Sequence, residues 1–413
     1  MRYLDIRNVG PIQSVHLELK RFNVFIGAQS IGKSTIAKIL STCCWVEKEV
    51  ITNMDEKSVP NGKAFKSLLE DFHKMESYID SQGTSFIHYE TEYIDICYEN
   101  DNLQVRAKNN EDYLRPKICY IPSERNMVTL PELQNFEFGE TNIRSFLFDW
   151  FNAREFFSVD NKAEIMNLGI KYYYDQEVKK NKDRIIHANG QTYGISLACA
   201  SSGLQSLVPL LIMLKYYSNE YYNSFDEKRS YGLDDKAIRL RRILTDRIVI
   251  ERYKPGFNMT ERGELLKEIN RKLHDGDENV NGLFQHYLES VEKLLTPHQT
   301  MFIIEEPEQN LFPNTQLDLM DTLVSLCKID RKHQFTITTH SPYIVNYLNV
   351  LLRQTSESGK RICVDELGVY LVIGGTIQNL MAEDLDTGET VVDATGLTEQ
   401  MEDIFNEYQS LGV

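Results

Sequence analysis

The sequence predicts an α/β fold, in which short apolar strands end in loops and lie near apolar helices. Three runs have strand character: FNVFIG at residues 22–27, MFII at residues 301–304 and FTITT at residues 335–339. The first run is followed by KSTIAKIL, which has the apolar spacing of a helix, and a long apolar helix begins near Ser202. We expect the second and third strands to be parallel neighbours, so that their carboxyl ends line one crevice.

A glycine-rich loop joins the first strand to the first helix. Its pattern is G-x-x-x-x-G-K-[ST], a backbone turn whose N–H groups surround phosphates at the start of a helix. Lys33 should reach the β- and γ-phosphates, and the Ser34 hydroxyl should bind Mg²⁺. The loop therefore predicts a nucleoside triphosphate site formed by Gly27, Ala28, Gln29, Ser30, Ile31, Gly32, Lys33, Ser34 and Thr35.

Two adjacent carboxylates end the second strand. We assign Glu305 to the Mg²⁺ shell and Glu306 to the water that attacks the terminal phosphate. The alternative is an amphipathic strand end with two solvated acids, and the tight turn at Pro307 and Glu308 disfavours it.

His340 ends the third strand, and the motif SSGLQ begins the long apolar helix. A single histidine is usually a core or surface residue, but this one should face the ligand crevice and sense the γ-phosphate. Ser202 suits the cap of its helix, and a Ser-Gly pair at a helix start binds anions without a lysine.

These four motifs follow one another along the chain in the order glycine loop, SSGLQ, glutamate pair and His340. In that order they resemble an ABC-type ATPase of the branch that includes Rad50, SMC and RecF. Within it, the chain is most similar to the OLD-like (overcoming-lysogenization-defect), or AAA15, group of stand-alone bacterial ATPases. The N-terminal run from residue 5 to residue 27 also resembles that group. Departures are the leucine at position 204 of the signature, and Asn310 and Phe312 where the group has histidines.

The resemblance implies ATP and Mg²⁺ as cofactors and a homodimer, or a higher homo-oligomer, with ATP at the interface. Ser202 and Gly203 would then contact the γ-phosphate of the ATP held by the partner protomer. Residues 120–126, YIPSERN, occupy the place of the family's Q-loop, but they contain no glutamine.

The motif positions predict five regions. They are an ATPase lobe I with the phosphate loop and a β-hairpin insert (1–126), a helical lobe ending in the signature helix (127–215), a short helical insert in place of a long coiled coil (216–297), an ATPase lobe II with the two glutamates and the switch histidine (298–346), and an acidic C-terminal region of strand, hairpin and helix (347–413). In more detail, we expect a hairpin turn at 100–102, helix over 142–182, a turn at 386–388 and a final helix.

Composition and charge limit the remaining choices. The net charge is −16, and no Lys, Arg or His follows Arg361, so binding of nucleic acid over the whole surface is disfavoured. The acidic region is either a solvated surface or a docking face for a basic partner. Seven cysteines without CxxC spacing indicate a reducing cytoplasm, and we expect no membrane segment.

Two functions remain in competition. The resemblance implies a sensor or scaffold subunit of a bacterial anti-phage system, like the ATPases of Septu or PARIS, which controls a separate nuclease or toxin. We expect no nuclease domain in this chain, because the OLD nuclease cluster is not matched after His340. The alternative is a RecF- or Rad50-like DNA-repair ATPase that clamps DNA, with residues 239–254 as the nucleic acid contact. The arginines of that segment fit a solvated helix face equally well.

Overall fold

The computed structural model describes residues 2–53, 60–80, 83–108, 112–130, 133, 139–187, 193–223, 235–355, 359–385 and 387–411. No helix in these ranges is both long and apolar enough to span a bilayer.

A six-stranded sheet forms the centre of the molecule and confirms the predicted α/β class. Its order is β15 (Thr376–Asn379), β14 (Leu367–Ile373), β3 (Phe22–Ile26), β13 (Gln334–Thr339), β12 (Gln299–Glu305) and β7 (Pro116–Ile121). Neighbours from β14 to β7 are parallel, and β15 is antiparallel to β14. The predicted pairing of the two strands that carry the glutamates and the histidine is therefore confirmed.

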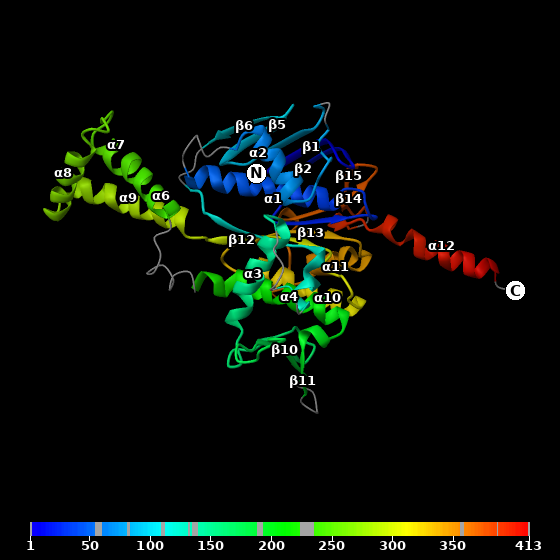
Figure 1. Cartoon of the computed structure of the whole chain (residues 1–413). Helices are drawn as coiled ribbons and strands as arrows, with labels where there is room; N and C mark the ends of the chain where they lie inside the picture. Colours follow the sequence, from blue (N-terminus) through cyan, green and yellow to red (C-terminus); the bar gives the residue numbers. More distant parts are fainter. Residues whose placement is uncertain are drawn as a thin grey trace.

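Helix α1 (Lys33–Asn53) lies between the central sheet and a second, antiparallel sheet (Figure 1). That second sheet has the order β2 (Ile12–Glu18), β1 (Tyr3–Val9), β4 (Phe86–Glu90), β5 (Ile94–Glu99) and β6 (Asn102–Ala107). The predicted hairpin is formed by β5 and β6, with Asn100 and Asp101 at positive φ in its turn. Short helix α2 (Gly62–Ser67) packs beside it.

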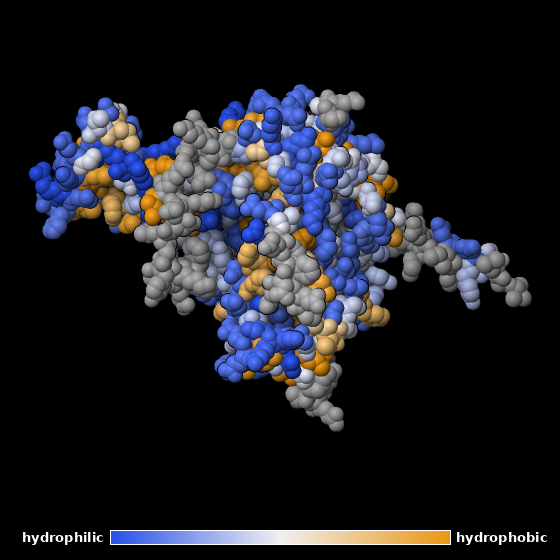
Figure 2. All heavy atoms as spheres, viewed as in Figure 1, coloured by the Kyte–Doolittle hydropathy of each residue, from blue (hydrophilic) through white to orange (hydrophobic). Residues whose placement is uncertain are grey.

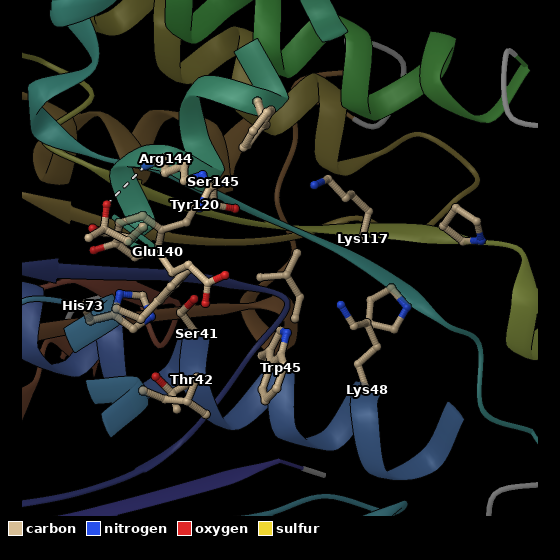
Figure 3. Close-up of a pocket in the computed structure, with 18 of the residues that line it drawn as sticks. Ser41, Thr42, Trp45, Lys48, His73, Lys117, Tyr120, Glu140, Arg144 and Ser145 are labelled. Carbon is tan, nitrogen blue, oxygen red and sulfur yellow. Dashed lines mark hydrogen bonds between the residues drawn. The ribbon is translucent and has the colours of Figure 1, made fainter. Parts of the chain in front are cut away.

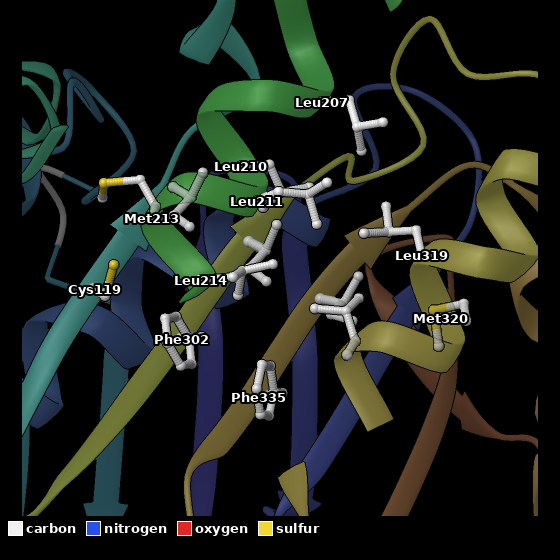
Figure 4. Packing of buried hydrophobic residues seen from close by; sticks show 14 of the residues in the cluster. Cys119, Leu207, Leu210, Leu211, Met213, Leu214, Phe302, Leu319, Met320 and Phe335 are labelled. Carbon is white, nitrogen blue, oxygen red and sulfur yellow. The ribbon is translucent and has the colours of Figure 1, made fainter. Parts of the chain in front are cut away.

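The other face of the central sheet is covered by α4 (Ser202–Lys215), α10 (Pro313–Cys327) and α11 (Pro342–Arg353). Figure 4 shows leucines of α4 over Phe302 and Phe335, whose rings stack 5.0 Å apart. Every residue of α4 from Ser206 to Leu214 is buried. This helix is therefore fixed rigidly against the strands that carry the predicted site.

The prediction of helix over 142–182 is wrong in its second half. Helix α3 (Asn142–Phe156) ends at Phe156. A four-stranded sheet follows, with β8 (Ala163–Glu164), β9 (Ile170–Tyr174), β10 (Asp183–His187) and β11 (Tyr193–Ser196). Residues 170, 172 and 174 are buried and alternate with half-buried ones, which is the period of a strand. The region 127–215 is therefore a mixed rather than a helical lobe.

The insert after α4 is helical, as expected, and projects from the body of the molecule (Figure 1). Within the described residues it comprises α6 (Asp235–Leu244), α7 (Glu251–Tyr253), α8 (Arg262–His274) and α9 (Glu278–Leu295), with a π-helical stretch at residues 245–250. Its base packs on the end of α1 through Ile51, Leu244 and Leu294. Figure 2 shows mostly hydrophilic residues over its tip.

The C-terminal region contains β14 and β15, the hairpin of β16 (Met381–Glu383) and β17 (Thr390–Val392), and helix α12 (Thr395–Leu411). The expected strand, hairpin and final helix are present; of the predicted turn at 386–388, Asp386 lies outside the described residues. Helix α12 extends away from the body (Figure 1).

Candidate active site

Four loops meet at one edge of the central sheet because four parallel strands end there. They are the glycine loop after β3, the glutamates after β12, His340 after β13 and residues 122–125 after β7. The carboxyl edge of a parallel sheet is where α/β proteins bind ligands. The sequence motifs are thus brought to one place.

The glycine loop has a backbone that excludes side chains at both glycines. Gly27 has φ 153° and Gly32 has φ 109°. A Cβ on Gly27 would lie 2.5 Å from the Val372 carbonyl oxygen, and one on Gly32 would lie 2.3 Å from Ile12 Cδ1. Gly27 is therefore required by packing as well as by conformation, and Gly32 by its conformation, which fits a loop shaped to hold phosphates.

Lys33 is 5% exposed and uses its ammonium group inside the loop. Its Nζ donates to the Gly27 carbonyl oxygen at 2.9 Å and to the Ala28 carbonyl oxygen at 2.6 Å, and it lies 3.3 Å from His340 Nδ1. Burial lowers the pKa of Lys33, and the carboxylates of Glu306 and Glu308 oppose that shift. A bound phosphate group would therefore replace these carbonyl oxygens as the hydrogen-bond acceptor of the ammonium.

His340 lies between this lysine and Glu306. An ammonium only donates, so Nδ1 of the imidazole accepts from Lys33 and Nε2 carries the proton. Nε2 lies 3.6 Å from Glu306 Oε1. The backbone N–H of His340 donates to Glu308 Oε1 at 2.6 Å. A chain of contacts thus joins Lys33, His340 and Glu306.

Glu308 is a buried carboxylate that the motif analysis gave no role. Burial raises its pKa, although the His340 N–H and other donors oppose the shift. Its Oε2 atom has no hydrogen-bond partner among the described residues. Glu308 therefore fixes the position of His340 and keeps one oxygen for a further donor.

Glu305 and Glu306 differ in their surroundings. Glu305 is 5% exposed, and the Tyr120 hydroxyl donates to its Oε1 at 2.6 Å. The Glu306 side chain is 35% exposed. Its φ is 45°, in the left-handed region that non-glycine residues rarely occupy. The turn thus directs one glutamate inward and the next toward the opening of the crevice.

The donor set fits a magnesium ion bound together with a nucleotide. Mg²⁺ takes oxygen ligands and usually retains waters, so one carboxylate and one hydroxyl suffice beside the phosphates. Glu305 on β12 and Ser34 on α1 would supply those two oxygens. No group of three or more His, Cys, Asp or Glu side chains that could hold a metal by itself exists within the described chain.

Arg125 is the main residue of the site that the motifs did not assign. It is fully buried, and Nη1 donates to the Glu305 carbonyl oxygen at 2.7 Å while Nη2 donates to that of Glu306 at 2.6 Å. Its Nε donates to the Ser206 carbonyl oxygen in α4 at 3.0 Å. Burial lowers its pKa to about 10. The residue thus fastens the glutamate turn to the signature helix.

The start of α4 is exposed, in contrast to the rest of that helix. Ser201 and Ser202 are exposed, and the N-cap is Ser201, so the prediction that Ser202 caps the helix is wrong. A Cβ on Gly203 would lie 2.9 Å from the Asn310 carbonyl oxygen. Asn310 Nδ2 also donates to Ser206 Oγ at 3.1 Å. Close packing against the glutamate turn therefore explains the glycine within a single chain.

Sequence reasoning placed the phosphate loop, both glutamates and His340 together, and it missed Tyr120, Glu308, Asn310 and the role of Arg125. For Tyr120 and Arg125, the sequence did contain a signal. The strand at 116–121 ends beside the glutamate strand, so residues at its carboxyl end should reach the same crevice.

Comparison with known proteins gives one family match and several structural likenesses. A family model described as "AAA ATPase domain" matches residues 282–345, which is less than half of the chain. No protein in the curated set matches the sequence.

Among solved structures, the SMC head domain from Thermotoga maritima is 11% identical, with a TM-score of 0.37, covering 93% of this chain and 100% of that one. The recombination mediator protein RecF is 10% identical, with a TM-score of 0.30 and coverages of 92% and 97%. The Smc head domain from Pyrococcus furiosus, bound to the C-terminal domain of ScpA, is 9% identical, with a TM-score of 0.37 and coverages of 99% and 100%.

The family match covers β12, the Glu305–Glu308 turn and His340, and thus the residues that the structure brings to the phosphate loop. The chain carries an ATPase domain segment and is an ATP-hydrolysing enzyme.

Proposed function

We propose that the protein is an ABC-type ATPase of the Rad50, SMC and RecF branch that binds ATP with Mg²⁺ at this crevice. The observation that carries the proposal is the chain of contacts from Lys33 through His340 to Glu306, built on the glycine loop. Lys33 and the loop N–H groups hold the phosphates, and Ser34 and Glu305 hold Mg²⁺. Glu306 orients the attacking water, and His340 reports the γ-phosphate to it.

The second part of the proposal is that two copies complete each site. Ser202 and the Gly203 amide lie at the exposed start of α4, a helix whose N-terminus carries partial positive charge. The family resemblance assigns them to the γ-phosphate held by the partner protomer. ATP would then join the two copies, and hydrolysis would release them.

The third part of the proposal concerns what the ATPase controls, and it rests on resemblance to Septu- and PARIS-type ATPases. The protein would act as an oligomeric sensor or scaffold that controls a separately encoded nuclease or toxin. The acidic C-terminal region offers a face for a basic partner, because Asp403 and Glu407 are exposed on the projecting helix α12. Reversing the charges of Glu399, Glu402 and Asp403 together should then release the partner during co-purification.

A second candidate function, a DNA-repair clamp, is favoured by one observation. Arg242, Arg247 and Arg252 are exposed on the projecting insert, whereas the side chain of Arg239 lies outside the described residues. A clamp of this kind would bind duplex DNA with a strong dependence on ATP and salt. The combined change Arg242→Glu and Arg252→Glu should abolish that binding if the clamp is correct.

The experiment that separates the two is a pull-down of tagged Glu306→Gln protein, expressed from its own locus, with MgATP present. This variant should retain ATP and hold the joined state. A neighbouring nuclease or toxin in defined ratio supports the sensor function. Nucleic acid without a protein partner rejects it in favour of the clamp.

A further inference from the structure

A second cavity of about 580 Å³ lies away from the phosphate loop, at the free edge of β7. Figure 3 shows Trp45 and Lys48 on α1 facing Lys117 of β7, with Arg144 and Ser145 of α3 on the far side. Its size is that of a typical small-molecule site, and helices and strands from three parts of the chain line it.

The cavity is cationic, although the protein as a whole carries a charge of −16. Four cationic side chains line it, against one carboxylate, that of Glu140. Lys117 pairs with Asp149 at 2.7 Å, and Lys48 lies 3.8 Å from Glu49. Arg115 and Arg144 make no ion pair within the described part of the chain. Arg115 Nη1 donates to the Leu295 carbonyl oxygen at 2.6 Å, so the guanidinium of Arg144 and the remaining N–H groups of Arg115 are the donors offered to an anion.

Two aromatic faces line the same cavity and remain accessible. Trp45 is 38% exposed and Phe148 is 55% exposed, so both rings can be reached by a ligand. The guanidinium of Arg144 lies 5.4 Å from the centre of the Phe148 ring. Aromatic faces beside arginines are the groups on which nucleic acid bases stack.

A buried polar atom in the wall lacks a partner. His73 is 1% exposed and lines the cavity, with its ring 5.3 Å from that of Tyr120. Its Nδ1 makes no hydrogen bond with any described residue. An unpaired buried nitrogen of this kind costs free energy unless a further group binds it. The wall thus lacks one hydrogen-bonding group that a ligand would supply.

We propose that this cavity is a second nucleotide site, distinct from the phosphate loop, which holds a base against Trp45 and Phe148 and a phosphate between Arg115 and Arg144. The polar edge of the base supplies the partner of His73 Nδ1. The ligand is either a free mononucleotide or the terminal nucleotide of a single strand. Tyr120 belongs to the wall and also binds Glu305, so the two sites share one side chain.

Tryptophan fluorescence tests this proposal, because the chain has two tryptophans and the other, Trp150, is fully buried. The protein should carry Lys33→Ala, so that binding at the phosphate loop is removed. ATP, GTP and a 5′-phosphorylated dinucleotide are titrated into it, with pyrophosphate and adenosine as the anion and base controls. Saturable quenching by a nucleotide is expected, and Trp45→Phe should remove the signal.

Arg144→Glu should weaken that binding by about tenfold or more, because a charge-assisted hydrogen bond is lost and repulsion is added. The matched control is Arg106→Glu, a charge reversal at an exposed position outside the cavity, which should bind as the parent does. Saturation by mononucleotides identifies the free ligand, and saturation by the dinucleotide alone identifies a strand end. No quenching up to millimolar nucleotide, or quenching that Arg144→Glu leaves unchanged, overturns the proposal.

Discussion

The two halves of the proposed ATP site are built in opposite ways. The half formed by the phosphate loop, the glutamate turn and His340 is interlocked by short contacts among largely buried groups. The half formed by the start of α4 exposes Ser201 and Ser202, and its N-cap side chain makes no capping hydrogen bond. We call the interlocked half the finished side and the exposed half the open side. An enzyme whose site is completed by a second copy of the chain needs both.

Arg125 shows that the halves are nevertheless coupled within one chain. Its guanidinium joins the glutamate turn to α4, so a displacement of α4 would reach Glu305 and Glu306 through hydrogen bonds. In the proposed dimer, a partner that contacts the start of α4 would therefore act on Glu305 and Glu306 through Arg125. The predictions below disturb the finished side, the connection and the open side in turn.

The largest effect is expected from Glu306→Gln on the finished side. Loss of the group that orients water should lower the rate of ATP hydrolysis by about 100-fold or more, while ATP binding is retained. Phosphate release and equilibrium dialysis measure the two quantities. Glu407→Gln, an exposed position on α12, is the control. Hydrolysis by Glu306→Gln at the parent rate would show that the water is oriented elsewhere.

Arg125→Met should break the connection. The change leaves the carbonyl groups of Glu305, Glu306 and Ser206 without their buried donor, which should lower the free energy of unfolding by about 3 kcal/mol. We expect kcat to fall by about tenfold or more in the protein that remains folded, because the glutamate turn loses its position. Denaturant unfolding and phosphate release check both. Arg7→Met, at an exposed arginine, is the matched control.

Normal kcat in folded Arg125→Met protein would mean that the turn is held without the guanidinium.

Ser202→Arg should block the open side and leave each monomer folded. We expect unchanged ATP binding and hydrolysis lowered by about tenfold, since a partner protomer could no longer approach. Mixing this variant with Lys33→Ala should restore part of the activity, because each mixed dimer has one intact loop facing one intact helix start. If mixing restores nothing while both variants are folded, the open side is not shared between copies.

The last prediction concerns stability rather than activity, at the buried His333, which directly precedes β13. The Thr300 N–H donates to its Nδ1 at 3.0 Å, and its Nε2 lies 2.8 Å from the Ser218 carbonyl oxygen, so the ring is neutral. Burial lowers its pKa from 6.5 to about 4. The unfolded chain then takes up the proton first, and stability falls as the pH drops below 6.5, by about 3 kcal/mol at pH 4.

Unfolding curves at pH 7 and pH 4.5 measure this loss. His333→Gln should show a smaller loss between the two values, whereas His16→Gln, at an exposed histidine, should match the parent. Equal losses in all three proteins would assign the pH dependence to other groups.

The sequence could predict that the motifs come together, because each is a local pattern with a local cause. Gly27 and Gly32 are needed at positive φ, and Glu305 and His340 follow apolar strands whose parallel pairing brings their ends together. Arg125 could not be assigned because its partners are backbone oxygens of residues 81 and 180 or more positions away. The β8–β11 sheet was missed because its strands are short and separated by polar turns, which weakens the period of two.

The regional boundaries and the trans role of Ser202 remain predictions. The boundaries of the five regions depend on how the lobes move relative to one another. The role of Ser202 at the partner's ATP depends on a second chain.

The mass of Glu306→Gln protein in solution, with and without MgATP, tests the central claim most directly. If one chain provides the finished half and its partner provides the open half, the variant should be a monomer alone and at least a dimer with MgATP. The combined change with Ser202→Arg should then stay monomeric in both conditions. A Glu306→Gln protein that binds ATP and remains monomeric at every concentration would contradict the account.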